Sequence, residues 1–230
     1  MPSHTKKPKR VVSFSTFNQQ GSGKVHSSVR NHHVVFMQET GSFPTTFKRS
    51  PKGHVTGTIR RSARLGGNLR VFGHEWGKAN LRCSLAVAVA EELLGASPKM
   101  HLIHAKKAKG LRPAVVVDTG DLVVASIHAP SGNHKFAASV TDEMIRTIQQ
   151  QFPGKPVVIG GDMNTTPDLL RTKINGSGMQ VTAPGGSTQK SGNTLDMFVY
   201  TPTQFAPTRV ESTQGFQGSD HLQVSMTGTL

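Results

Sequence analysis

Short apolar runs rich in β-branched residues recur along the chain, and turn-forming residues separate them. The clearest runs are Val34–Met37, Ala114–Val117, Leu122–Ile127 and Val157–Ile159. Their length and their Val and Ile content are typical of buried β-strands. Further strands are predicted at Arg10–Phe17, 54–60, 68–74, Leu195–Tyr200 and Leu222–Thr227. A chain with so many short strands is expected to build β-sheets.

Helical patterns are fewer. Phe136–Phe152 places Val140, Met144, Ile145 and Ile148 on one face, which predicts an amphipathic helix. Cys83–Leu94 stays open, because its Ala and Glu content favours a helix while its alternation favours a strand. Many strands with few helices indicate the α/β (α+β) class, as a sandwich of sheets with helices outside.

No linker-like segment interrupts the chain, so we expect one domain over residues 10–230. Residues 1–9 form a basic tail, expected to be disordered or to act as a nuclear address or a DNA-contacting arm. The single cysteine, Cys83, excludes an internal disulfide. Neither a secretory signal nor a transmembrane run is recognisable, which leaves open a secreted effector acting in a host nucleus or an intracellular protein.

The charge balance points to polyanionic partners. A net charge of +14 attracts nucleic acid first and acidic membranes second. Five arginines are candidates to lie along a duplex, with an ordinary solvated face as the alternative: Arg60, Arg61, Arg64, Arg70 and Arg82. Glu39 is the only acidic residue before Glu75, so its pKa should be depressed, as befits an ion-pair partner or a metal ligand.

Polar residues of catalytic type follow or flank the apolar runs. Strand ends on a rigid scaffold are places where side chains from distant parts of a sequence converge. Gln38-Glu39 follows one run, His128 another and Asp162-Met163-Asn164 a third; Asp196 opens a run and Asp220-His221 precedes the last. Each piece alone has an ordinary explanation, since Asp and Asn are common in turns. The ordered set is the informative feature.

Such a set suits phosphodiester hydrolysis. A hard cation bound by carboxylate and amide oxygens neutralises phosphate charge, a base deprotonates water, and cationic or N–H donors hold the phosphate oxygens. Two histidines, several carboxylates, Asn18, Asn164 and Arg112 supply these groups.

The set also resembles a known family. Asn18, Gln38-Glu39, Ile127-His128-Ala129-Pro130, Gly161-Asp162-Met163-Asn164, Leu195-Asp196 and Ser219-Asp220-His221 match, in order, the endonuclease/exonuclease/phosphatase superfamily. Residues 38–44, 111–115 and 190–196 look most like the catalytic subunit of cytolethal distending toxins. This resemblance covers roughly residues 10–228. It implies a four-layer α/β/β/α sandwich of two mainly antiparallel sheets flanked by helices.

The resemblance also implies roles. Glu39 would be the main Mg²⁺ ligand with Asn18 and Asp220 nearby, and Mn²⁺ or Ca²⁺ could substitute. His221, held by Asp196, would activate water, and Asp162 and Asn164 would position water and phosphate. His128 would bind the phosphate or assist the leaving group, and Arg112 would hold the phosphate backbone.

The expected function is a Mg²⁺-dependent endonuclease that nicks DNA through backbone contacts. A role as a genotoxin is a further expectation. Toxin subunits of this kind work with delivery subunits, which the sequence does not reveal. A phosphoinositide phosphatase using the same site and a catalytically silent nucleic-acid-binding protein are the two alternatives.

Overall fold

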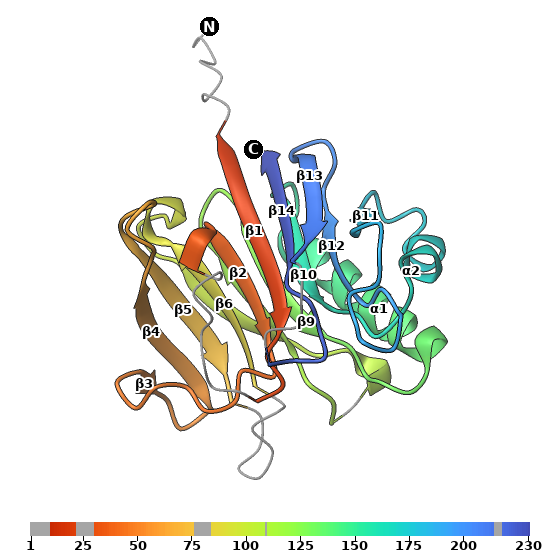
Figure 1. Cartoon of the computed structure of the whole chain (residues 1–230), viewed down its shortest axis with the longest axis horizontal. Coiled ribbons are helices and arrows are strands. Elements are labelled where there is room, and N and C mark those ends of the chain that lie inside the picture. Colours follow the sequence, from red (N-terminus) through yellow and green to blue (C-terminus); the bar gives the residue numbers. More distant parts are fainter. Residues whose placement is uncertain (1–9, 22–29, 76–83, 109, 214–217) are drawn as a thin grey trace, which may run out of the picture.

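The computed structural model describes residues 10–21, 30–75, 84–108, 110–213 and 218–230. The basic tail expected at residues 1–9, Arg82 and Cys83 lie outside this part of the chain. Two β-sheets face each other, and helices α1 (His134–Gln151) and α2 (Pro167–Lys173) cover the outer face of one sheet (Figure 1). The expected sandwich of two sheets flanked by helices is confirmed.

Both sheets are mixed. Among the described residues, the larger sheet has eight strands in the order β13 (Ala206–Ser212), β14 (Val224–Thr229), β1 (Val11–Asn18), β2 (Val34–Gln38), β6 (Leu85–Ala90), β5 (Asn68–His74), β4 (His54–Arg60) and β3 (Lys48–Arg49). The smaller, within the same residues, has six in the order β11 (Gln180–Thr182), β12 (Asp196–Tyr200), β10 (Val157–Asp162), β9 (Val123–His128), β8 (Ala114–Asp118) and β7 (Lys99–Ile103). The β1–β2 and β9–β10 pairs are parallel.

Apolar side chains from both inner faces form the core between the sheets. Phe14 and Phe36 of the larger sheet belong to the same buried cluster as Val124, Val158 and Phe198 of the smaller one. Gly160 in β10 lets the two sheets approach, because a Cβ at this position would lie 2.3 Å from Cδ2 of Phe36. The close approach holds the ends of β1, β2, β9 and β10 near one another.

The two outer faces are covered differently. The predicted apolar face of α1 is buried against the smaller sheet, through Val140, Met144, Ile145 and Ile148. On the larger sheet, within the described residues, the rings of Phe43 and Phe47 pack on the outer face instead of a helix. The Phe47 ring fills the space that a Cβ of Gly57 would occupy, at 2.3 Å.

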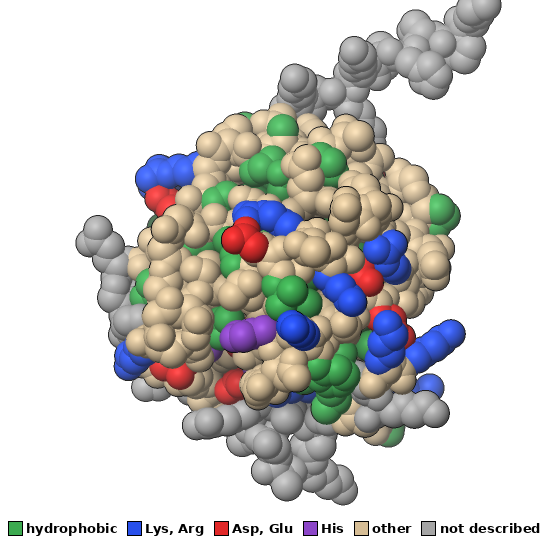
Figure 2. All heavy atoms as spheres, turned by 90° about the vertical axis from the view of Figure 1, so that its right-hand side faces the viewer, with side chains coloured by type: hydrophobic (Ala, Val, Ile, Leu, Met, Phe, Trp, Pro, Cys, Tyr) green, Lys and Arg blue, Asp and Glu red, His purple; other side chains and the backbone are tan. Residues whose placement is uncertain are grey.

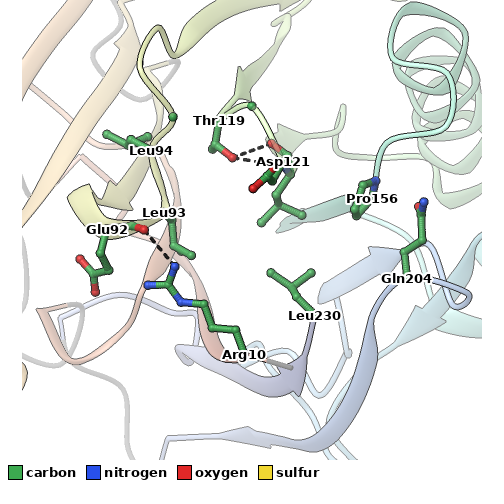
Figure 3. Close-up of a pocket in the computed structure, with 12 residues that line it drawn as sticks. Arg10, Glu92, Leu93, Leu94, Thr119, Asp121, Pro156, Gln204 and Leu230 are labelled. Atoms are coloured by element: carbon green, nitrogen blue, oxygen red, sulfur yellow. Dashed lines mark hydrogen bonds between the residues drawn. The ribbon is translucent and has the colours of Figure 1, made fainter. Parts of the chain in front are cut away.

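A cavity of about 600 Å³ opens between the sheets at the β8–β9 turn (Figure 3). Leu93, Leu122 and Leu230 contribute apolar walls, and Arg10 at its rim donates a hydrogen bond to the backbone carbonyl of Glu92 at 2.9 Å. β9 runs from this end toward His128 at the other, and no side chain expected at the site lines the cavity.

No helix within the described residues has both the length and the apolar content needed to cross a bilayer.

Candidate active site

The site is built where the two parallel strand pairs end. Asn18 and Gln38 are the last residues of β1 and β2 and pair in register. His128 and Asp162 are the last residues of β9 and β10 and also pair in register, while Asp196, the first residue of β12, pairs with Asp162. The Asn18 amide closes the gap between the sheets by donating to Oδ2 of Asp162 at 3.0 Å. Residues distant in sequence therefore meet at one end of the sandwich.

His221 and Asp196 form a buried dyad. Nδ1 of His221 lies 2.8 Å from Oδ2 of Asp196. Because a carboxylate only accepts hydrogen bonds, Nδ1 carries the hydrogen, and Nε2 of the neutral ring is an acceptor. The hydroxyl oxygen of Thr188 accepts the backbone N–H groups of Leu195 and Asp196 at 2.9 and 3.0 Å, which anchors the start of β12. This is the arrangement of a general base held in one tautomer.

Asp162 lies between the two histidines. Its Oδ2 is 3.5 Å from Nε2 of His128 and 3.7 Å from Nε2 of His221, and its Oδ1 accepts the backbone N–H of Asn164 at 3.0 Å. Burial raises the pKa of Asp162 to about 7, with the Asp196 charge adding to the rise and His221 opposing it. Burial likewise raises the pKa of Asp196.

The two histidines are shifted in opposite directions. Burial lowers the pKa of His128 well below its usual value, and the positive charges of Arg112 and His221 add to the effect. Burial also acts to lower the pKa of His221, but the hydrogen bond and charge of Asp196, with Asp162 and Asp220, raise it to about 9. The site therefore pairs a neutral imidazole with one that readily takes up a proton.

Glu39 and Asp220 bring further oxygens to this group. Oε1 of Glu39 lies 3.7 Å from Nε2 of His128, and Oδ1 of Asp220 lies 3.5 Å from Nε2 of His221. Glu39 adopts a left-handed backbone conformation, with φ of 47°, which is uncommon for residues other than glycine and is often found at functional sites. Its carbonyl accepts the N–H of Gly21 at 2.7 Å, which ties the β1 and β2 ends together.

The oxygen set fits a hard divalent cation such as Mg²⁺. Asp162, Asp196 and His221 offer ligand-type atoms within 4.8 Å of one another. Because Asp196 and Nδ1 of His221 already bond each other, Asp162 is the carboxylate of this group left for a cation. Asn18 bonds Asp162 at 3.0 Å, and the expected ligands Glu39 and Asp220 lie 3.7 and 3.5 Å from the Nε2 atoms of His128 and His221. A cation beside Asp162 would also lower its pKa, which burial raises with a further contribution from the charge of Asp196.

The remaining expected residues lie at the same end. The Arg112 guanidinium lies against the His128 ring, with Nη1 2.9 Å from Nε2. The Asn164 amide donates to the carbonyl of Ala129 at 2.8 Å, in a left-handed turn with φ of 47°. Gln38 differs, because its amide donates to the hydroxyl of Ser126 at 2.9 Å inside the sandwich, which makes it a structural tie.

The sequence motifs did not predict three contributors to the site: Gln20, Thr188 and Gln189. Gln20 bonds Asp220, and Nε2 of Gln189 lies 3.3 Å from Nε2 of His221. Gln20 stands two residues after Asn18 and Gln189 within the segment before Asp196. Their closeness in sequence to expected site residues could have pointed to Gln20 and Gln189. Sequence spacing alone does not predict the contacts of Gln20 with Asp220 or of Gln189 with His221.

The expectation that Arg61 lines a duplex is wrong. Its guanidinium is buried and forms an ion pair with Glu92, so it cannot reach a ligand. The site end of β4 and β5 is the end of His54 and His74, because His74 pairs with Leu85, which pairs with Gln38. Arg60 and Arg70 lie at or near the opposite ends of these strands. At the site end, Lys48 and Lys52 are exposed cations.

The chain resembles several solved structures. CdtB, the biologically active subunit of cytolethal distending toxin, is similar with a TM-score of 0.75 and 18% identity, over 94% of this chain and 96% of that one. The Haemophilus ducreyi cytolethal distending toxin gives 0.72 and 21% identity, over 94% and 97%. The human nocturnin catalytic domain, solved with a bound sulfate anion, gives 0.57 and 14%, over 95% and 94%. These likenesses show a shared fold.

No curated protein matches the sequence. The model of the endonuclease/exonuclease/phosphatase family does match it, over residues 15–221, which is most of the chain. The match spans Asn18, Glu39, His128, Asp162, Asp196 and His221. The chain therefore belongs to the endonuclease/exonuclease/phosphatase family.

Proposed function

We propose that this protein is a Mg²⁺-dependent phosphodiesterase that nicks DNA. The observation that carries the proposal is the arrangement of His221, His128 and Asp162. The Nε2 atoms of both histidines approach the same Asp162 oxygen, at 3.7 and 3.5 Å, and only His221 is backed by a carboxylate. One imidazole is equipped to take a proton and the other to donate a hydrogen bond.

In the proposed reaction, water attacks phosphorus and the bond from phosphorus to the leaving oxygen breaks. The products are a phosphomonoester and an alkoxide, which takes a proton from solvent to become the alcohol, while the proton taken up by His221 is later released to solvent. His221 takes the proton of the attacking water at Nε2, and Asp196 stabilises the imidazolium that forms. Asp162 and Asn164 orient the water and the phosphate. Neutral His128 donates a hydrogen bond to a phosphate oxygen or to the leaving oxygen, and Arg112 holds a non-bridging oxygen.

Oxygens of Glu39, Asp220 and Asn18 would hold the proposed cation. When bound, it would neutralise charge on the phosphate and on the leaving oxygen. Burial, together with the charge of Asp196, raises the pKa of Asp162 to about 7, and a cation nearby would favour the ionised form of this carboxylate. The positive charge of a cation would lower the pKa of His221 and so leave it unprotonated, as a base must be.

DNA is the proposed substrate because the net charge of +14 favours binding to a polyanion. Figure 2 shows the face that bears α1 and α2, where basic side chains lie beside acidic ones. Arg146 pairs there with Asp142 and Arg171 with Asp168, at 2.8 and 2.6 Å. Lys48 and Lys52, in and beside the edge strand β3, are exposed cations at the same end of the larger sheet as the site.

The likeness to CdtB extends the proposal to a genotoxic subunit that other subunits deliver. Breaks in nuclear DNA of cells that receive the purified chain would support this extension. Intact nuclear DNA in cells that demonstrably contain the chain would refute it.

Supercoiled-plasmid nicking tests the proposal. Wild type is compared with His128→Ala and His221→Ala, in Mg²⁺ and in EDTA. His101→Ala is the matched control, because His101 lies in β7 and its ring packs on Phe152 rather than in the site. We expect nicking that needs Mg²⁺, persists in the control and falls at least a hundredfold in both site variants.

Two other results would each replace the proposal. Release of phosphate from a soluble inositol polyphosphate without plasmid nicking would favour the phosphoinositide phosphatase. Retardation of DNA by a folded wild type, with no cleavage in Mg²⁺, would favour a silent binding protein.

A further inference from the structure

Gln20 makes two bonds with Asp220, a residue 200 positions away in the sequence. Its side-chain amide nitrogen donates to Oδ1 of Asp220, and its amide oxygen accepts the backbone N–H of Asp220 at 3.2 Å. A carboxylate only accepts and a backbone N–H only donates, so the orientation of the Gln20 amide is fixed. The side chain therefore holds Asp220 in both position and orientation.

The backbone of the same residue holds Asn18. The N–H of Gln20 donates to Oδ1 of Asn18 at 3.1 Å, and Nδ2 of Asn18 donates to Oδ2 of Asp162 at 3.0 Å. The orientation of the Asn18 amide is fixed by the same logic, since its oxygen meets a donor and its nitrogen a carboxylate. A continuous chain of hydrogen bonds thus runs from Asp220 through Gln20 and Asn18 to Asp162.

The backbone of Gln20 is held in an unfavourable conformation. Its φ is 48°, in the left-handed region that glycine adopts far more readily. The flanking N–H groups hold the turn in place, because Gln19 donates to the carbonyl of Gln38 at 2.8 Å and Gly21 to that of Glu39 at 2.7 Å. Such strain persists where the surroundings over-determine the conformation, often at functional sites.

We propose that Gln20 is a positioning residue that holds Asn18 and Asp220 at the spacing a divalent cation requires. This inference rests on the proposed metal dependence of the site. Gln20 itself need not touch the cation, because each of its bonds orients an oxygen-bearing neighbour. Groups that orient metal ligands in this way change metal affinity about tenfold to a hundredfold when they are removed.

Two substitutions separate the effect of the side-chain hydrogen bonds of Gln20 from the effect of its left-handed backbone strain. Gln20→Met removes the amide but keeps a similar length. Gln20→Gly also removes it, keeps the N–H that bonds Asn18, and relieves the left-handed strain. Gln204→Met is the control, because Gln204 also donates a hydrogen bond from its side-chain amide, in this case to the carbonyl of Gly154 at 2.9 Å, but lines the cavity remote from the site.

The measurement is isothermal titration of metal-free protein with Mg²⁺. We expect both Gln20 variants to bind Mg²⁺ at least tenfold more weakly than wild type and Gln204→Met to bind normally. The thermal midpoint of metal-free Gln20→Gly should equal or exceed that of wild type. In plasmid nicking, excess Mg²⁺ should restore the rate of the Gln20 variants, with KM for DNA unchanged.

Mg²⁺ affinities of both Gln20 variants within twofold of wild type would overturn this inference, and would leave the proposed function intact if wild type still nicks DNA with Mg²⁺. A wild type that binds no Mg²⁺ would overturn the inference together with the metal dependence of the proposed function.

Discussion

Replacing Asp196 with Asn tests the link between the buried dyad and the chemistry of His221. The substitution keeps the size of the side chain and removes its charge. In the wild type, burial acts to lower the pKa of His221, but Asp196, through its 2.8 Å hydrogen bond and its charge, leads the groups that raise it to about 9. Without the carboxylate, burial dominates, so the pKa of His221 should fall below 6.5, its ordinary value.

The size of the effect follows from linkage. A shift from 6.5 to about 9 corresponds to about 3 kcal/mol in favour of the imidazolium. Since the folded pKa of His221 is raised, this stabilisation is fully present below pH 6.5 and is lost as the pH rises through about 9. Asp162 acts in the same direction at lower pH, because its pKa rises from 3.8 to about 7 and the folded state retains the proton. Metal-free wild type should therefore lose stability steadily from acidic to alkaline pH.

Two assays check this prediction. Urea unfolding in EDTA at pH 6 to 9 should show a falling free energy of unfolding for wild type and a much flatter curve for Asp196→Asn. Proton NMR of the His221 ring should give a midpoint near 9 in wild type and below 6.5 in the variant. Nicking in Mg²⁺ should fall by about 10² to 10⁴ in the variant, the usual contribution of a general base. The same pH dependence and the same His221 midpoint in both proteins would refute the reasoning.

Three further predictions concern packing, substrate contact and a surface ion pair. Gly160→Ala should cost about 1–3 kcal/mol of unfolding free energy in urea, because its Cβ would lie 2.3 Å from the Phe36 ring; an unchanged midpoint would contradict this. Lys48→Ala with Lys52→Ala should reduce the slope of log affinity for DNA against log salt by about 2. An unchanged slope would remove both lysines from the DNA surface. Burial acts to raise the pKa of Asp118, but Lys155 at 2.7 Å lowers it overall, so Asp118→Asn should cost up to about 1 kcal/mol at pH 7 and progressively less as the pH falls below 3.8, the ordinary value; a cost that does not fall with pH would contradict it.

The strands that form the site could be read from the sequence because they are buried on both faces. For residues 85–90 the local sequence pattern does not decide the secondary structure, because it is compatible with both a helix and a strand. In the structure they form β6, with Val87 and Val89 in the core between the sheets and Ala86 and Ala88 under Phe43 and Phe47. Valine and alanine do alternate between the two faces of β6. The small alanines are explained by the two different cores on either side of the larger sheet, because they pack beneath the Phe43 and Phe47 rings.

The elements that the sequence did not predict are short or lie at sheet edges. α2 spans Pro167–Lys173 and buries only Leu170, so its apolar periodicity is too brief to detect. β13 is an edge strand without a fully buried residue. Long-range pairing, which local propensity does not contain, determines such elements.

The ordered motifs identified most groups of the site, but not how they are connected. Asp162 and His221 were expected there, and the structure brings both together with Asp196. The bonds from Gln20 to Asp220 join the two ends of the chain, so they depend on the β1–β14 pairing rather than on any local pattern. Arg61 illustrates the opposite error, because charge alone does not distinguish a ligand-binding arginine from one buried against Glu92.

The most direct test of the central claim is single-turnover cleavage of a defined duplex oligonucleotide in ¹⁸O-water with Mg²⁺, followed by mass spectrometry of the products. Hydrolysis at this site predicts one ¹⁸O atom in the newly formed phosphate, and at least a hundredfold slower cleavage by His221→Ala. Absence of cleavage by folded wild type, or equally fast cleavage by His221→Ala, would contradict the assignment of phosphodiester hydrolysis to this site.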